Sequence, residues 1–302
     1  MIVTVTLNPA LDLTYTVDAL VPHGTHRVAA VAERPGGKGL NVAGVLHALG
    51  EPVLATGLLG GATGDRVATL LAEQGVPAAF EPIAGETRRT VAVTDRQDAT
   101  GFWEPGPRIG TGEWAAFAAR FRGLLAGADV VTLSGSLPPG VPEDGYAVLI
   151  RLAARAGVPT VLDTGGEALR RGLAAGPDLA KPNAHELAAL VPGGRPADVL
   201  AHGARAVVVS RGPEGLHAQS PEGAWQGIPA APLTGNPTGA GDACVAALAR
   251  GLRDRTPWPE LVADAVALSA AAVAAPVAGT VDPGLYRRML PGVTVTDLRT
   301  AA

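Results

Sequence analysis

The residues best suited to chemistry lie in a glycine-rich segment, NPTGAGDA at residues 236–243, which leads into an apolar helical run, Ala240–Leu252. Glycines allow backbone N–H groups to converge without interference from a Cβ atom. A helix that begins there adds unpaired N–H groups and the positive end of its dipole. The segment therefore predicts a site for an anion, most naturally a phosphate group.

The carboxylate of Asp242 is unusual in an anion site. It is placed to take a proton from a hydroxyl group whose oxygen attacks a phosphorus atom held by the segment. The alternative is a glycine-rich turn in which the aspartate only caps the helix. The eight residues alone leave both interpretations open.

A second glycine-rich segment, Gly36-Gly37-Lys38-Gly39, precedes a predicted helix over Asn41–Leu49. Its lysine is one of only two in the chain, the other being Lys181. Glycines around a lysine let the backbone approach a ligand while a cation reaches into the site. The alternative is a flexible loop with a solvated lysine, and the spacing of a P-loop is absent.

Two further segments contain residues suited to bind the substrate that accepts the phosphoryl group. Asp12 follows the first strand, where a ligand of a doubly wound sheet is met, and would accept hydrogen bonds from sugar hydroxyls or act as a turn residue. Arg88 and Arg89 are adjacent on a predicted strand, so their side chains point to opposite faces. Either one of them binds a substrate phosphate or both are solvated.

Two segments favour a nucleotide site. Asn183 and Glu186 have the spacing of a capping box, while their functional interpretation places them near nucleotide phosphates and the water shell of Mg²⁺. Ser210, Gly212 and Gly215 follow a buried strand. They form either a hairpin turn or a surface on which an adenine or ribose lies against bare backbone.

Composition narrows the class of protein. The 302 residues carry a net charge of −4 and no cluster of basic residues, so nucleic-acid binding is not expected. No apolar run reaches the ~20 residues of a membrane span, and Met1 leads straight into a strand pattern without a signal peptide. The single cysteine, Cys244, excludes an internal disulfide and suits packing in a cytoplasmic protein.

Strand-like and helix-like runs alternate, which indicates a mainly parallel, doubly wound sheet. We expect strands at Ile2–Leu7, Val53–Thr56, Val91–Thr94, Val130–Leu133, Thr160–Leu162 and Ala206–Val209. We expect further helices at Asp65–Gln74, Glu113–Leu125, Asp144–Ala156 and Ala184–Leu190, and a buried helix within Ala263–Ala275. Segments of about 13–32 and 88–104 lack helices and predict a small antiparallel sheet inserted in one domain, residues 1–302.

Together these motifs resemble the ribokinase-like (PfkB) carbohydrate kinases over most of the chain, about residues 2–281. The segments GGKGLNVA and GAGD match that family's two signatures in the family's order. The segments TLNPALD, EPGP, SGSLPPG and KPNAHEL are similar to the branch of 1-phosphofructokinases and tagatose-6-phosphate kinases. The resemblance implies a three-layer α/β/α core with a mainly parallel sheet and a small β-sheet lid, which often helps to form a homodimer.

The resemblance also implies ATP-dependent phosphorylation of a sugar phosphate with Mg²⁺. Asp242 would be the base, and the backbone of Gly239, Ala240 and Gly241 the anion hole. Residues implied for the acceptor are Asp12, Gly37, Lys38, Asn41, Arg88 and Glu104. Residues implied for the nucleotide are Lys181, Asn183, Ser210, Gly212, Gly215 and Thr238, with Glu186 serving the metal through water.

The chain departs from this branch beside the acceptor. Members typically have asparagine and lysine two and four residues after the Thr-Arg pair, where this chain has Thr90 and Ala92. A lost cation weakens phosphate binding, since a hydrogen bond to a charged group contributes roughly 1.5–3 kcal/mol. The alternatives are a kinase for an unphosphorylated sugar or nucleoside and a non-catalytic sugar- or nucleotide-binding protein.

Overall fold

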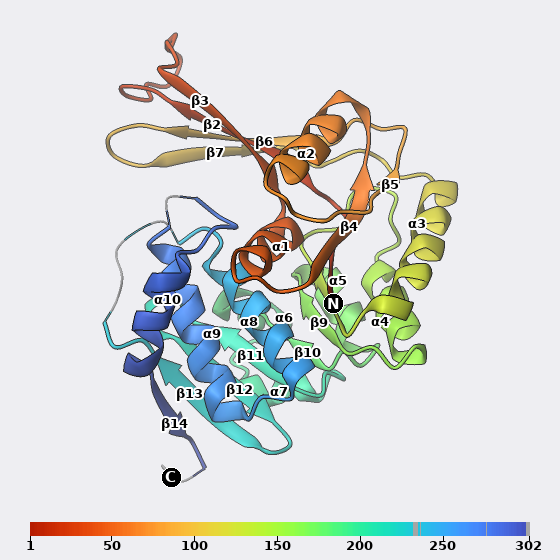
Figure 1. The fold of residues 1–302 in the computed structure, drawn as a ribbon, viewed down its shortest axis with the longest axis vertical. Coiled ribbons are helices and arrows are strands. Elements are labelled where there is room, and N and C mark those ends of the chain that lie inside the picture. The colour runs from red at the N-terminus through yellow and green to blue at the C-terminus, as the bar shows by residue number, and fades with distance from the viewer. Residues whose placement is uncertain (232–234, 236, 276, 300–302) are drawn as a thin grey trace.

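A ten-stranded sheet forms the centre of the computed structural model, which describes residues 1–231, 235, 237–275 and 277–299 (Figure 1). Its strand order is β14-β13-β12-β11-β10-β9-β8-β1-β4-β5. From β11 to β5 all neighbours are parallel, whereas β11 to β14 pair antiparallel. The strands are β1 (Ile2–Thr6), β4 (Val53–Leu59), β5 (Glu81–Pro82), β8 (Val130–Ser134), β9 (Thr160–Asp163), β10 (Leu179–Ala180), β11 (Val207–Ser210), β12 (Leu216–Ser220), β13 (Gly223–Ile228) and β14 (Thr294–Asp297).

Helices cover both faces of this sheet and give three layers (Figure 1). One face packs on α1 (Lys38–Ala48), α2 (Gly61–Glu73), α8 (Ala240–Asp254), α9 (Trp258–Val273) and α10 (Pro283–Met289). The other packs on α3 (Thr111–Leu124), α4 (Gly145–Arg155), α5 (Gly166–Leu173), α6 (Ala184–Leu190) and α7 (Pro196–Leu200). Strand residues alternate between these two apolar cores, which explains why the central strands are continuously apolar.

The small sheet has the order β3-β2-β6-β7, with β2 (Ala10–Thr16), β3 (Ala30–Gly36), β6 (Arg88–Thr94) and β7 (Ala99–Trp103). Its strands project beyond the helical layers in Figure 1. The expectation of a purely antiparallel sheet is wrong, because the central pair β2–β6 is parallel. The reason is that β2 follows β1 and β6 follows β5. Because β1 and β5 run in the same direction, both connections leave the large sheet at the carboxyl ends of its parallel strands.

Most predicted core elements are confirmed, with ends that shift by a few residues. The buried helix begins earlier than its apolar run, at Trp258, and ends at Val273. Cys244 is buried in α8, and this burial raises the pKa of its thiol to about 11, which agrees with a packing role. Among the described residues, no helix has the length and apolar character needed to cross a membrane.

Candidate active site

The first turn of α8 begins at a glycine that no other residue would replace easily. Gly239 has φ of 90°, and a Cβ there would lie 2.9 Å from the Cα of Ala278. The backbone can therefore turn sharply into the helix and leave its first N–H groups facing the site. Thr238 precedes this turn, while Asn236 lies outside the described residues.

Asp242 lies in this first helical turn and is only 6% exposed. Its Oδ2 accepts a hydrogen bond of 2.8 Å from Nδ2 of Asn41 in α1. Burial, together with the negative charge of Asp163, raises the pKa of Asp242 to about 6, although Asn41 and two lysines oppose the shift. A carboxylate with such a pKa can accept a proton near neutral pH.

Both lysines of the chain bind one buried carboxylate at the end of β9. Oδ1 of Asp163 lies 3.2 Å from Nζ of Lys181 and 3.3 Å from Nζ of Lys38. Burial lowers the pKa of Lys181, but the surrounding groups, chiefly Asp163, together outweigh that effect, so the pKa lies above its ordinary value and the side chain stays charged. A Cβ on Gly241 would lie 3.5 Å from Nζ of Lys181, which puts this cation beside the start of α8.

Sequence reasoning did not include Asp163 among the candidate residues. It is the last residue of β9, at the edge of the sheet where the other candidates gather, and that position was the available signal. Its Oδ2 atom is buried and has no hydrogen-bond partner among the described residues. A buried carboxylate oxygen without a partner marks a place where a ligand can be accommodated.

The Asn183–Glu186 segment forms the capping box that its spacing predicts. Oδ1 of Asn183 accepts from the N–H of Glu186, and Oε2 of Glu186 accepts from the N–H of Asn183. The other carboxylate oxygen of Glu186 lies 3.9 Å from Nζ of Lys38. Ser210 pairs with Asn183 in a parallel bridge, so these residues belong to one region of the site.

Gly212 and Gly215 form the hairpin turn between β11 and β12, as one of the two interpretations predicts. Gly215 has φ of 82°, and a Cβ there would lie 2.0 Å from the carbonyl oxygen of Gly227. Close packing of the hairpin therefore explains this glycine without a ligand. The turn begins immediately after Ser210, beside the Asn183 region.

The small sheet supplies a second group of polar residues. Thr90 donates a hydrogen bond to Oδ1 of Asp12, which lies opposite it on β2. Burial raises the pKa of Asp12, and Thr90, Arg88 and Arg34 oppose that shift. Arg88 donates from Nε to the carbonyl of Asn8 at 3.2 Å and from Nη1 to the carbonyl of Glu104 at 3.2 Å.

Arg88 and Arg89 point to opposite faces, as strand alternation predicts. Oε1 of Glu104 lies 3.2 Å from Nη2 of Arg89, and Oε2 accepts from the backbone N–H of Arg89. The carboxylate of Glu104, expected among the acceptor-binding groups, thus pairs on the outer face with Arg89. Its backbone carbonyl, instead, holds Arg88.

Arg34 is a second residue whose role the sequence did not reveal, because nothing nearby in the chain distinguishes it from a solvated arginine. It lies opposite Asp12 in the register of β2 and β3. Its Nη2 donates to the carbonyl of Ala278, and its Nη1 is buried without a hydrogen-bond partner among the described residues. Arg34 therefore joins the small sheet to the segment that abuts Gly239.

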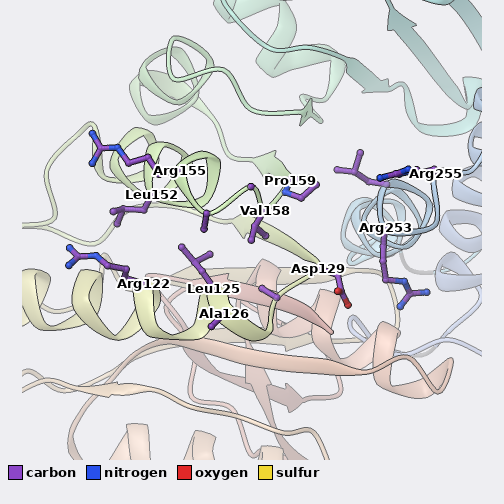
Figure 2. A pocket seen from close by; sticks show the side chains of 14 residues that line it. Arg122, Leu125, Ala126, Asp129, Leu152, Arg155, Val158, Pro159, Arg253 and Arg255 are labelled. Atoms are coloured by element: carbon purple, nitrogen blue, oxygen red, sulfur yellow. The ribbon is translucent and has the colours of Figure 1, made fainter.

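A cavity of about 1050 Å³ lies at the amino ends of the parallel strands, on the opposite side of the large sheet from the candidate active site (Figure 2). Residues beside the beginnings of β8 and β9, such as Asp129 and Pro159, line it. Three of its arginines, Arg122, Arg155 and Arg253, stand in the last turns of α3, α4 and α8. Cations there offset the negative ends of the helix dipoles, which explains them without a ligand.

The profile of the pfkB family of carbohydrate kinases matches residues 5–283. The chain belongs to this family. Phosphofructokinase-2 from Escherichia coli, in a crystal structure with potassium, is 32% identical, with a TM-score of 0.90, covering 96% of this chain and 98% of that one. A possible 1-phosphofructokinase from Thermotoga maritima is 28% identical, with a TM-score of 0.89, covering 99% of both chains.

Membership in the PfkB family defines the enzyme class of this chain. It is a carbohydrate kinase, a phosphotransferase whose acceptor is a hydroxyl group, and sugar kinases of the family use ATP. A putative phosphofructokinase from Staphylococcus aureus is also similar, at 26% identity and a TM-score of 0.84, with 99% of both chains covered. The ribokinase-like fold expected from the sequence is therefore confirmed.

Proposed function

We propose that this PfkB kinase, acting as one kinase domain over residues 1–302, transfers the γ-phosphoryl group of ATP to a hydroxyl of a phosphorylated ketohexose. Candidate acceptors are fructose 1-phosphate, tagatose 6-phosphate and fructose 6-phosphate. The phosphofructokinase-2 of Escherichia coli has been crystallised with fructose-6-phosphate, at 32% identity to this chain. The observation that carries the proposal is the buried Asp242 beside Lys181 at the start of α8.

Asp242 acts as the general base in this proposal. It removes the proton from the attacking hydroxyl as the new O–P bond forms and the bond to the leaving oxygen of ADP breaks. The N–H groups of Gly239, Ala240 and Gly241 stabilise the charge on the transferred phosphoryl group. Lys181 adds a fixed cation beside them, and such preorganised charges lower the barrier because they need no rearrangement.

We assign Lys38 to the transferred phosphoryl group instead of the acceptor's own phosphate. Its ion pairs with Asp163 and Glu186 support this assignment. Asn183, Ser210, Gly212, Gly215 and Thr238 remain the proposed nucleotide-binding residues. The bridge between Asn183 and Ser210 supports a continuous nucleotide site.

Mg²⁺ fits this site as an ion held largely through water and phosphate oxygens. The described residues contain no cluster of three metal-ligating side chains. Oδ2 of Asp163, which has no hydrogen-bond partner within the described ranges, and the carboxylate of Glu186 provide oxygen groups of the type that Mg²⁺ prefers. When bound, the ion would neutralise charge on the phosphates of ATP.

The acceptor lies against the small sheet in this proposal. Asp12 accepts hydrogen bonds from its hydroxyls, and Arg88 binds its phosphate. Gly37, just before α1, and Asn41, within α1, line the site. The hydrogen bond from Asn41 to Asp242 supports a location of the acceptor next to the base. The same small sheet, acting as a lid, would exclude water from the transfer.

A second candidate is a kinase for an unphosphorylated sugar or nucleoside. Ala92 lacks the cation that similar kinases have, and Arg89 is paired with Glu104 on the outer face. Arg88 would then bind no phosphate. Replacing Arg88 with alanine separates the two candidates, because only a phosphorylated acceptor would lose affinity.

We also propose a homodimer that forms through the outer face of the small sheet. Val31 and Phe102 are 58% and 57% exposed, and Leu13 and Val91 share their face. Exposed apolar side chains grouped on one face are typical of an interaction surface. Analytical ultracentrifugation tests this assignment, and Phe102→Glu should shift the sedimentation coefficient to that of a monomer.

ADP release with MgATP against an acceptor panel tests the proposed function. The panel contains fructose 1-phosphate, fructose 6-phosphate, tagatose 6-phosphate, fructose, ribose and adenosine. A preference for a phosphorylated ketose supports the proposal, whereas a preference for a neutral acceptor contradicts it. Asp242→Asn controls for contaminating kinases, because it should abolish any ADP release that belongs to this enzyme.

A further inference from the structure

A row of side chains crosses one face of the small sheet. Arg34 lies opposite Asp12, Asp12 opposite Thr90, and Thr90 opposite Trp103. Residues directly opposite in paired strands share a face. The hydrogen bond from Thr90 to Asp12 agrees with this arrangement. Trp103 therefore belongs to the same face as the proposed acceptor-binding residues.

This face looks toward the start of α8. Arg34 reaches across to the carbonyl of Ala278, and Ala278 lies against Gly239. Phe102 and Arg89 point to the opposite face, because side chains alternate along a strand. Trp103 is thus separated by the sheet from the apolar outer face of Val31 and Phe102.

The indole of Trp103 lies over a floor made of small residues. A Cβ on Gly101 would lie 2.5 Å from Cη2 of Trp103 and 2.7 Å from Cζ2, so the ring rests directly on this glycine. Gly101 belongs to the next row of the same face, whose members have very short side chains: Ala32, Thr14, Ala92 and Gly101. Ala92, where similar kinases typically have lysine, therefore neighbours the glycine that carries the ring.

Trp103 is 74% exposed, more than any other large apolar side chain among the described residues. The other three tryptophans are more protected, and Trp225 and Trp258 stack on each other with ring centroids 5.4 Å apart. A tryptophan can bury 150–250 Å² when a partner covers it. An indole exposed on the ligand-facing side of a lid keeps that burial available for a ligand.

We propose that Trp103 is a specificity-determining residue whose indole stacks against the carbon-bearing face of a cyclic sugar acceptor. The inference rests on the proposed function, in which this face of the small sheet covers the acceptor. A sugar ring presents C–H groups on one face, and these pack on an aromatic ring while the hydroxyls at the edge bind Asp12. The site thus uses an apolar wall on the side where similar kinases use a lysine. Acyclic polyols lack such a face and should bind weakly.

Kinetics of Trp103 variants test this stacking. Trp103→Ala should raise the KM of the best acceptor about tenfold, with kcat and the KM of ATP changed by less than about threefold. Trp103→Phe keeps a flat aromatic ring and should restore the KM to within about threefold of the wild-type value. Gly101→Ala should act like Trp103→Ala, because its methyl group displaces the indole without removing it.

Fluorescence provides a readout without nucleotide or turnover. Adding the acceptor should shift the emission of the wild-type enzyme to shorter wavelength and reduce acrylamide quenching about twofold, and Trp103→Phe should lose both changes. Phe102→Ala, which removes the neighbouring aromatic residue from the other face, should keep the protection by acceptor. Protection that depends on protein concentration instead of acceptor would show that a second copy covers Trp103, and would overturn the inference.

The outcomes distinguish this inference from the proposed function. If a phosphorylated ketose is turned over but its KM is unchanged in Trp103→Ala, the stacking inference fails and the proposed function stands. If only a neutral cyclic sugar is turned over, the proposed acceptor class fails, and a raised KM for that sugar in Trp103→Ala still supports stacking. If no panel member is turned over and none protects Trp103, both are wrong.

Discussion

The start of α8 and the inner face of the small sheet differ in how completely their polar groups are buried and paired. Around α8, Asp242, Asp163 and Lys181 are all buried, and ion pairs or hydrogen bonds hold each of them. On the small sheet, Trp103 is exposed, and Nη1 of Arg34 has no hydrogen-bond partner in the part of the chain that the structure describes. The charged side chains of Asp242, Asp163 and Lys181 are therefore already buried and held in place, although Oδ2 of Asp163 has no hydrogen-bond partner among the described residues. The second region, in contrast, leaves the exposed indole of Trp103 for a ligand to cover.

This difference indicates separate roles for the two regions: phosphoryl transfer around α8 and recognition of the acceptor on the small sheet. A buried, fixed network of charges suits phosphoryl transfer, which depends mainly on positioning and electrostatic stabilisation. Exposed groups on strands that project from the core suit recognition of one acceptor among several similar molecules. We therefore expect changes around α8 to lower kcat and changes on the small sheet to raise the KM of the acceptor.

Removal of the proposed base should have the largest effect. Asp242→Asn keeps the shape of the side chain and its contact with Asn41 but cannot accept the proton. We expect kcat to fall by about 10²–10⁴, the usual contribution of general acid–base catalysis. Steady-state ADP release under saturating MgATP measures this, and kcat within threefold of the wild-type value would contradict the assignment.

Arg88→Ala should have the next largest effect. Loss of a charged hydrogen bond of about 1.5–3 kcal/mol corresponds to roughly a 10- to 150-fold rise in the KM of a phosphorylated acceptor. Arg88→Lys, which keeps the charge, provides the matched control and should fall between the two. An equal loss with a neutral and a phosphorylated acceptor would show that Arg88 acts only by holding the small sheet in place.

The pH dependence of kcat/KM should report the raised pKa of Asp242. Below a pKa of about 6 the carboxyl group is protonated, so the rate should fall about tenfold for each pH unit. Rates measured from pH 5 to 8 in buffers of constant ionic strength give this profile. A rate that stays constant down to pH 5 would show that burial does not perturb the group in the working enzyme.

The stability of the folded protein should fall with rising pH, whereas activity should rise, because both depend on the raised pKa of Asp242. The pKa of Asp242 rises from an ordinary 3.8 to about 6 in the folded protein, so folding becomes less favourable as pH rises through this range. Above pH 6 the cost is complete, at roughly 2–3 kcal/mol. Asp242→Asn should therefore raise Tm by a few degrees at pH 7.5 and much less near pH 4. Differential scanning fluorimetry at both pH values tests the sign.

The outer ion pair should matter least. Glu104 and Arg89 are 47% and 54% exposed, and such pairs typically contribute about 0–1 kcal/mol. Glu104→Gln should therefore leave the KM of the acceptor within about twofold, as kinetic assays can verify. A tenfold rise would place the carboxylate in the acceptor site after all.

The features predicted correctly from the sequence are those that short local patterns determine. Apolar runs predicted the central strands, and the Asn183–Glu186 spacing predicted a capping box that forms. The glycine segment before Asp242 predicted a tight turn into a helix, and Gly239 adopts the required positive φ. These features depend on residues close in sequence, so one chain without its structure reveals them.

The missed features depend on contacts between distant segments. The position of Asp163 directly after a predicted strand was visible in the sequence, but its ion pairs with Lys38 and Lys181, 125 and 18 residues away, appear only in the folded structure. Arg34 contacts Ala278 across 244 residues of sequence. The parallel pairing of β2 with β6 likewise follows from where both strands leave the core, and local alternation cannot distinguish it from antiparallel pairing.

Isothermal titration calorimetry of acceptor binding tests most directly whether catalysis and acceptor recognition belong to separate regions. The proteins compared are wild type, Asp242→Asn and Arg88→Ala. Our account predicts that Asp242→Asn binds the acceptor with a Kd within about threefold of wild type although its turnover is lost. Arg88→Ala should show weakened binding while its kcat at saturating acceptor stays within about fivefold. Loss of acceptor binding in Asp242→Asn, or an unchanged Kd in Arg88→Ala, would contradict it.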